Sequence, residues 1–224
     1  MENHVILMSE VSMKKVLVIF ICMVLASMLI ACESKVDTHN REALKYVRMG
    51  NYTEALNLLN KAVELDPEDD TSWNNISLCY DAIGEYQLAL EAAQKAVNLG
   101  EESEIEYSNL GNAYFDLGNI EEAKMAYEKA LEIDDEYFYA LYGMGIYYSE
   151  KEEYEKALEY FYNLYNNNPI NVDVVRYIAF CNYKLGLVDE SIEFLQAELD
   201  KVSSTELEQL LELLLEYRHT HSDE

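Results

Sequence analysis

The sequence has little glycine, little proline and few basic residues. Its 224 residues include 8 Gly and 2 Pro, too few for the many tight turns of an all-β fold. Only 16 Lys and Arg stand against 43 Asp and Glu, so the formal net charge is −27. Such an acidic surface repels phosphate backbones, which argues against a nucleic-acid partner. Half of the residues are hydrophobic, enough for a buried core, and the expected structure consists of long helices with short turns.

An apolar run near the N-terminus has the features of a targeting segment. Residues 16–31 read VLVIFICMVLASMLIA, and two lysines precede them. The run is shorter than the roughly 20 residues that span a hydrocarbon core, and it fits the apolar part of a secretory signal peptide over residues 1–31. The stretch before Met13 is unusually long and acidic for such a signal, so Met1 and Met13 are both candidate starts.

The end of this run resembles the lipobox of bacterial lipoproteins. It reads Leu29-Ile30-Ala31-Cys32, and a polar segment follows. The resemblance implies cleavage before Cys32, acyl chains such as palmitate on that cysteine, and attachment to the extracytoplasmic face of a cell membrane. Several acyl chains give stable anchoring, which a single chain does not. Residues 32–37 are then a short tether. The choice between inner and outer membrane stays open, and an uncleaved signal anchor is the alternative.

A repeat of 34 residues fills most of the remaining chain. Turn-like segments recur at this spacing and open on one column of residues: Gly50, Gly84, Gly118, Glu152 and Gly186. Five frames fit without a gap: 36–69, 70–103, 104–137, 138–171 and 172–205. So regular a register indicates a repeat architecture in which each unit packs on its neighbours. Among the glycines, only Gly143 has no recurring place.

Each frame divides into two amphipathic halves. In the third frame, apolar and small residues fall at i, i+3, i+4, i+7 and i+10, which is one stripe of a helix: Tyr107, Leu110, Gly111, Tyr114 and Leu117. A turn at Gly118 follows. The second half repeats small residues around one aromatic, at Ala123, Tyr127 and Ala130, which allows close approach of two helices. The unit is therefore predicted to be a helix-turn-helix.

These features resemble the tetratricopeptide repeat family. The second frame carries the resemblance most fully, with Trp73, Tyr80, Gly84, Tyr86, Ala89 and Ala96. The resemblance implies an all-α, right-handed superhelical solenoid of about five repeats over residues 38–205. The departures lie in the end frames. The first frame has Glu42 where an apolar residue is usual, and the fifth has Asn182, Ser191 and Glu198 in place of a tyrosine and two alanines. A capping helix is expected over 206–218, opened by a capping box of Thr205 and Glu208, and a disordered tail over 219–224.

Little is left over for catalysis. The repeat accounts for most glycines, and no phosphate-binding loop, nucleophile elbow or zinc helix remains. Cys79 and Cys181 are predicted to be small core residues, with a reactive thiol as the alternative. His219 and His221 lack a third ligand, so no metal site is expected. The many carboxylates recur on presumed solvent faces, which favours solvation over a glycosidase-like acid pair. No cofactor and no small-molecule substrate are expected.

The family resemblance also implies where a partner binds. Tetratricopeptide solenoids present the first helix of each unit along a concave groove, and the 34-residue frame places the following residues there: Asn74, Asn112, Phe115, Tyr139, Tyr142, Arg176, Phe180 and Tyr183. Exposed tyrosines beside an arginine are typical of protein-binding hot spots. The alternative is that these aromatic side chains only pack between units.

The leading functional prediction is a membrane-anchored, non-enzymatic adaptor that binds a protein or peptide in this groove. An alternative is an assembly or pilotin-like factor for an envelope machine such as pili, an outer-membrane protein complex or a cell-wall complex. A carboxylate-using hydrolase is a remote alternative.

Overall fold

The computed structural model describes residue 21 and residues 35–169 and 171–221. The chain divides into two compact units, the first ending at Gly100 and the second beginning at Glu101. The predicted signal peptide, apart from residue 21, and the predicted lipidation site at Cys32 lie outside the described residues. None of the helices in the described part is both long and apolar enough to cross a membrane.

The first unit consists of helices joined by short turns. A helical segment over residues 35–48 is followed by α2 (Tyr52–Leu65), α3 (Asp70–Ala82) and α4 (Tyr86–Leu99). The first segment extends into the predicted tether, because residues 35–37 are already helical. Val36 is buried there, and removing its apolar side chain from water favours the helix over an extended linker.

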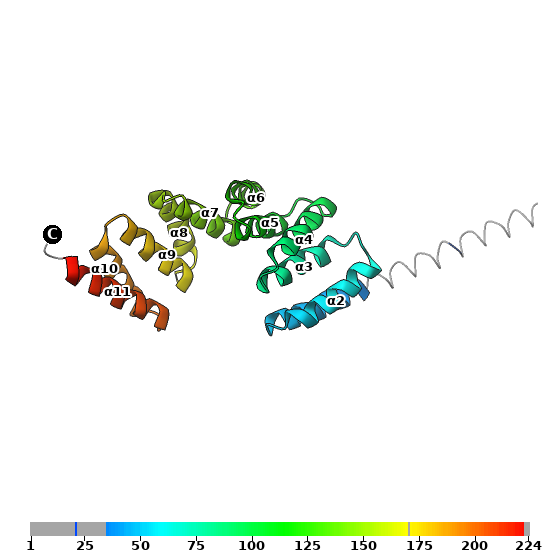
Figure 1. Ribbon diagram of the computed structural model, residues 1–224, viewed down its shortest axis with the longest axis horizontal. Coiled ribbons are helices and arrows are strands. Elements are labelled where there is room, and N and C mark those ends of the chain that lie inside the picture. The colour runs from blue at the N-terminus through cyan, green and yellow to red at the C-terminus, as the bar shows by residue number, and fades with distance from the viewer. Residues whose placement is uncertain (1–20, 22–34, 170, 222–224) are drawn as a thin grey trace, which may run out of the picture. The chain divides into compact units, whose positions relative to one another are not determined.

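The second unit continues the same pattern of helix pairs. It contains α5 (Glu104–Asp116), α6 (Ile120–Ile133), α7 (Phe138–Glu150), α8 (Tyr154–Asn167), α9 (Val172–Lys184), α10 (Val188–Leu199) and α11 (Thr205–His221). Figure 1 shows these elements as successive helical hairpins. All regular structure of the described residues is α-helical, which confirms the predicted all-α fold of helix-turn-helix repeats.

The turn inside each repeat depends on a residue with positive φ. Gly118 has φ of 77°, and the amide of Asn119 donates to the carbonyl of Tyr114 at 2.9 Å. Glycine adopts this left-handed conformation without steric cost, so it ends the first helix of a repeat. In the fourth repeat Glu152 takes the same place with φ of 59°. The turn geometry therefore persists where the glycine is missing.

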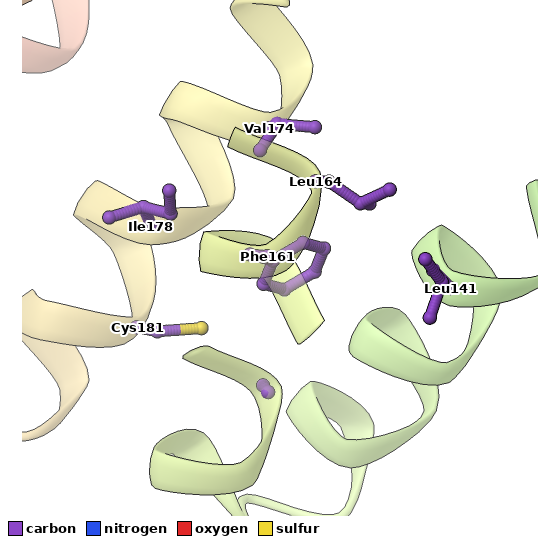
Figure 2. Close-up of a cluster of buried hydrophobic side chains, with 7 residues drawn as sticks. Leu141, Phe161, Leu164, Val174, Ile178 and Cys181 are labelled. Atoms are coloured by element: carbon purple, nitrogen blue, oxygen red, sulfur yellow. The ribbon is translucent and has the colours of Figure 1, made fainter. Parts of the chain in front are cut away.

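A central core of the second unit lies between α7, α8 and α9. Its buried members are Leu141, Ala157, Phe161, Leu164, Val174, Ile178 and Cys181. Figure 2 shows Phe161 in the middle of this cluster, between Leu141 of α7 and Ile178 of α9. The ring of Phe161 lies so close to Gly145 that a Cβ atom there would sit 2.6 Å from it. Glycine at 145 thus lets α7 and α8 approach.

Tyr127 on α6 is wedged between two first helices. Its side chain is only 2% exposed. A Cβ atom built at Gly111 on α5, or at Gly143 on α7, would lie 2.5 Å from its ring. This contact explains Gly143, the one glycine without a place in the repeat.

The fifth repeat buries a carboxylate where the pattern has a small residue. Glu198 on α10 is 2% exposed. Its Oε1 accepts hydrogen bonds from Tyr165 Oη at 2.6 Å and from Lys201 Nζ at 2.6 Å. Because a buried charge is tolerated only when paired and hydrogen-bonded, the three side chains form one unit that joins α8 to α10.

The last helix differs from its prediction at both ends. The hydroxyl of Ser204 accepts from the amide of Leu207 at 3.4 Å, so Ser204 takes the capping place that the sequence pattern assigns to Thr205. At the other end α11 continues to His221, three residues into the predicted tail. The ring of His221 stacks on Tyr217 with centroids 4.2 Å apart, which favours an additional turn of helix.

Candidate protein-binding surface

Aromatic side chains form a continuous row across α7 and α9. Tyr139 contacts Phe138 edge to face at 5.4 Å between centroids, and Phe138 stacks on Tyr142 at 6.0 Å. Tyr142 in turn contacts Tyr177 of α9 at 5.7 Å. The row ends at Arg176, whose guanidinium lies 4.8 Å from the centre of the Tyr177 ring. Successive first helices of the second unit are therefore linked by ring contacts.

A hollow of about 400 Å³ continues this row between α9 and α11. Asp173 and Arg176 line it from α9, and Glu206, Gln209, Leu210 and Leu213 line it from α11. Leu213 is 63% exposed, which is unusual for a leucine within a packed array. We refer to the row and the hollow together as the α7–α9–α11 surface, defined by Tyr139, Tyr142, Arg176, Tyr177, Glu206, Leu210 and Leu213.

Arg176 is held in place at the centre of this surface. Its Nη2 donates to Oδ1 of Asp173 at 3.0 Å, one turn earlier on α9. The guanidinium also lies over the face of Tyr177. The arginine is half-buried and lines the hollow.

The two predicted tyrosines of α7 have different surroundings. Tyr139 is 59% exposed, so its ring is open to a partner. Tyr142 is half-buried among Phe138, Phe161 and Tyr177. Burial, more than the neighbouring Tyr177 and Asp173, raises the pKa of the Tyr142 phenol. Tyr142 therefore packs beneath the surface, whereas the exposed ring of Tyr139 can contact a partner.

The remaining predicted groove residues of the second unit lie apart from the hollow. Asn112 Oδ1 accepts a hydrogen bond from Tyr127 Oη at 2.8 Å, and Phe115 packs against the cluster around Tyr127. Phe180 contacts Tyr154 of α8 edge to face at 6.2 Å. These three side chains are half-buried and have packing partners within the second unit.

Two further predicted residues lie elsewhere. Tyr183 contacts Tyr217 of α11 at 5.2 Å between centroids, nearly perpendicular to it, and so docks the last helix. Asn74 is a buried residue of α3 in the first unit. Within the second unit, the structure therefore links Tyr139, Tyr142 and Arg176 through one row of ring contacts, and of the predicted residues of this unit Arg176 lines the hollow.

Sequence reasoning missed the contribution of α11. The segment was predicted to cover the last repeat with a leucine face, and Leu207 and Leu214 do so. Leu210, Leu213 and Tyr217 form a second stripe at i, i+3 and i+7. Leu210 and Tyr217 also help to dock α11, whereas Leu213 is 63% exposed. This leucine exceeds what a capping face needs and is the signal that could have placed α11 at the site.

Neither metal binding nor thiol chemistry is suggested by the structure. Within residues 35–169 and 171–221, no three His, Cys, Asp or Glu side chains are arranged to hold a metal ion. Burial raises the pKa of Cys79 and of Cys181 to about 11, and both thiols are buried and unpaired. A thiol with so high a pKa is a poor nucleophile at neutral pH, which favours the prediction that both are core residues.

Comparison with solved structures places the fold among known repeat proteins. PilF from Pseudomonas aeruginosa is 20% identical over 86% of this chain and 90% of its own, with a TM-score of 0.71. TTC0263 from Thermus thermophilus is 19% identical over 80% of this chain and 98% of its own, with a TM-score of 0.69. YrrB, described as a TPR protein with an unusual peptide-binding site, is 20% identical over 75% of this chain and 87% of its own, with a TM-score of 0.58. At these identities the likeness shows the fold alone.

Sequence comparison shows the family. No curated protein sequence matches this chain. Three family models, each described as the tetratricopeptide repeat, match residues 40–104, 105–137 and 126–159. Together these matches cover residues 40–159 without a gap, which is more than half of the chain and most of the first four 34-residue frames. The chain therefore belongs to the tetratricopeptide repeat family.

Proposed function

We propose that this protein is a non-enzymatic adaptor, anchored to the extracytoplasmic face of a membrane through lipid on Cys32, and that its α7–α9–α11 surface binds a segment of a partner protein. The tetratricopeptide fold supports a protein-interaction role, since the repeats build a surface and leave no catalytic constellation of the kinds considered above. The observation that carries the proposal is the open hollow beside Arg176, flanked by Leu213 and the aromatic row.

The composition of this surface suits protein binding. Protein interfaces are enriched in tyrosine and arginine, and hot spots lie where such side chains are already held in position. Arg176 is positioned by Asp173 and Tyr177, so its ordering costs little on binding. Tyr139 and Leu213 have more than half of their surface exposed, which leaves apolar area for a partner to cover.

Photo-crosslinking in intact cells tests the binding role. A benzophenone amino acid is placed at Leu213, at Tyr139 or, as a control, at Met125, which is 58% exposed on α6 and does not line the hollow. We expect one protein to be captured from positions 213 and 139 and not from 125. Equal capture from all three positions, or capture from 125 alone, would contradict the proposal.

A separate experiment tests the membrane anchor. Cells are grown with labelled palmitate, and the protein is recovered from wild type and from Cys32→Ala. We expect the label to be lost from the variant. Label that persists in Cys32→Ala would show that Cys32 is not the lipidation site, without bearing on the binding surface.

A further inference from the structure

The second unit carries most of the negative charge of the protein. Residues 101–224 contain 29 Asp and Glu but only 8 Lys and Arg, a formal net charge of −21. Seven of the eight basic side chains already form ion pairs within the unit: Lys124, Lys129, Lys151, Lys156, Arg176, Lys201 and Arg218. The eighth, Lys184, lies over the ring of Phe180. The field of this unit therefore attracts cationic partners and repels a second copy of the chain.

The hollow has an unbalanced carboxylate at its edge. Arg176 and Asp173 neutralise one another at 3.0 Å. Glu206 is exposed in the first turn of α11, and among residues 35–169 and 171–221 no basic group forms an ion pair with it. Leu210 and Leu213 adjoin it. An apolar wall that ends at a carboxylate fits a lysine or arginine, whose aliphatic stem packs on leucine while the charge reaches the acid.

The other end of the surface offers aromatic faces to a cation. Tyr137 and Tyr139 contact each other at 5.8 Å between ring centroids, and Tyr139 is 59% exposed. The exposed face of an aromatic ring attracts a cation through the ring quadrupole, and the negative charge of the unit adds to this attraction.

The spacing between these two places follows from the repeat. Tyr139 lies in the first turn of α7 and Glu206 in the first turn of α11, with α9 between them. The steps from α7 to α9 and from α9 to α11 are at least as long as the about 8–10 Å between packed helices, so the two places are at least about 16–20 Å apart. An extended chain needs at least about five residues to cover this distance.

We infer that the α7–α9–α11 surface takes an extended peptide segment of the partner with two lysine or arginine residues at least about five positions apart. One of them binds at Glu206 beside Leu210 and Leu213, and the other binds at Tyr139. The inference rests on the proposed function and specifies the chemistry of the partner. It follows from the juxtaposition of the hollow, the unbalanced carboxylate and the exposed ring on a unit of strongly negative charge.

A random library of 12-residue peptides displayed on phage and selected on the full-length protein tests this inference. We expect pairs of basic residues at that spacing to be enriched about tenfold over the unselected library. The best peptide, made synthetically, should bind about fivefold more weakly to Glu206→Gln and to Tyr139→Ala. Two matched variants, Glu212→Gln on the exposed side of α11 and Tyr162→Ala on α8, should keep wild-type affinity, and circular dichroism should match for all four.

Each other result of the selection contradicts the inference in a distinct way. Enrichment of acidic or uncharged peptides whose binding is lost in Leu213→Ala would refute the cationic segment but leave the binding surface standing. Equal weakening by Glu206→Gln and Glu212→Gln would show a general attraction between charges. Failure to enrich any peptide would refute both the inference and the proposed function.

Discussion

Replacing Gly143 with alanine should destabilise the protein, although alanine is the better helix former. The new Cβ atom would lie 2.5 Å from Cζ of Tyr127 and 2.6 and 2.7 Å from Cε1 and Cε2. Carbon atoms in favourable contact are about 3.5–4.0 Å apart, so the ring must move by about 1 Å. It cannot move freely, because the ring also fits closely against α5, where a Cβ atom built at Gly111 would lie 2.5 Å from it. The substitution must therefore separate the helices or expel the ring.

The magnitude follows from three terms. Overpacking of a core costs about 1–3 kcal/mol. Displacement of Tyr127 also strains its hydrogen bond to Asn112, 2.8 Å long, a loss of about 1 kcal/mol. Alanine in place of glycine within a helix stabilises the helix by about 1 kcal/mol. The expected loss of unfolding free energy is about 2 kcal/mol.

Urea denaturation followed by circular dichroism measures this loss. With a slope of about 2 kcal/mol/M, the midpoint should fall by about 1 M. The control repeats Gly143→Ala in a Tyr127→Leu background, because leucine has none of the ε and ζ ring atoms that the new methyl group meets. There the alanine should be neutral or stabilising. Equal destabilisation in both backgrounds would refute the reasoning.

Two further predictions concern buried polar groups and thiols. Tyr165→Phe removes the hydrogen bond to the buried Glu198 carboxylate and should lower the free energy of unfolding by about 2 kcal/mol in the same urea assay. The control Tyr162→Phe, on the exposed side of α8, should lower it by less than about 0.5 kcal/mol. Similar losses for both variants would contradict the account. The Cys79 and Cys181 thiols, with pKa of about 11, should resist a thiol reagent at pH 8 in the folded protein and react after unfolding, as followed by peptide mass spectrometry. Rapid labelling of either in the folded state would contradict their place in the core.

Much of the fold could be predicted because its signals are periodic. Turns recur every 34 residues, and the structure places positive φ at all four predicted turn glycines and at Glu152. Exceptions to the period were harder to interpret. Gly143 has no counterpart in other repeats because its role depends on one neighbouring ring, that of Tyr127. In the sequence Glu198 is only a departure from the repeat pattern, since Tyr165, which donates a hydrogen bond to it, lies on another helix.

The 34-residue frame predicts only some residues of the candidate site. Transferring groove positions by the repeat finds Tyr139 and Arg176, because the frame fixes which way each first helix faces. It cannot say which half-buried aromatics have packing partners, such as Phe180, which contacts Tyr154 of α8. It also omits Leu213, because α11 lies beyond the last full frame.

The affinity of the protein for the segment captured at position 213 tests the central claim most directly. Isothermal titration would compare the wild type with Leu213→Ala and, as the matched control, Met125→Ala. Leu213→Ala removes three carbon groups. Because Leu213 is 63% exposed, a partner covers the equivalent of about two of them, worth about 1.6 kcal/mol, so the variant should bind at least about tenfold more weakly. Met125→Ala should bind as the wild type does. Unchanged affinity for Leu213→Ala would contradict a binding role for the α7–α9–α11 surface.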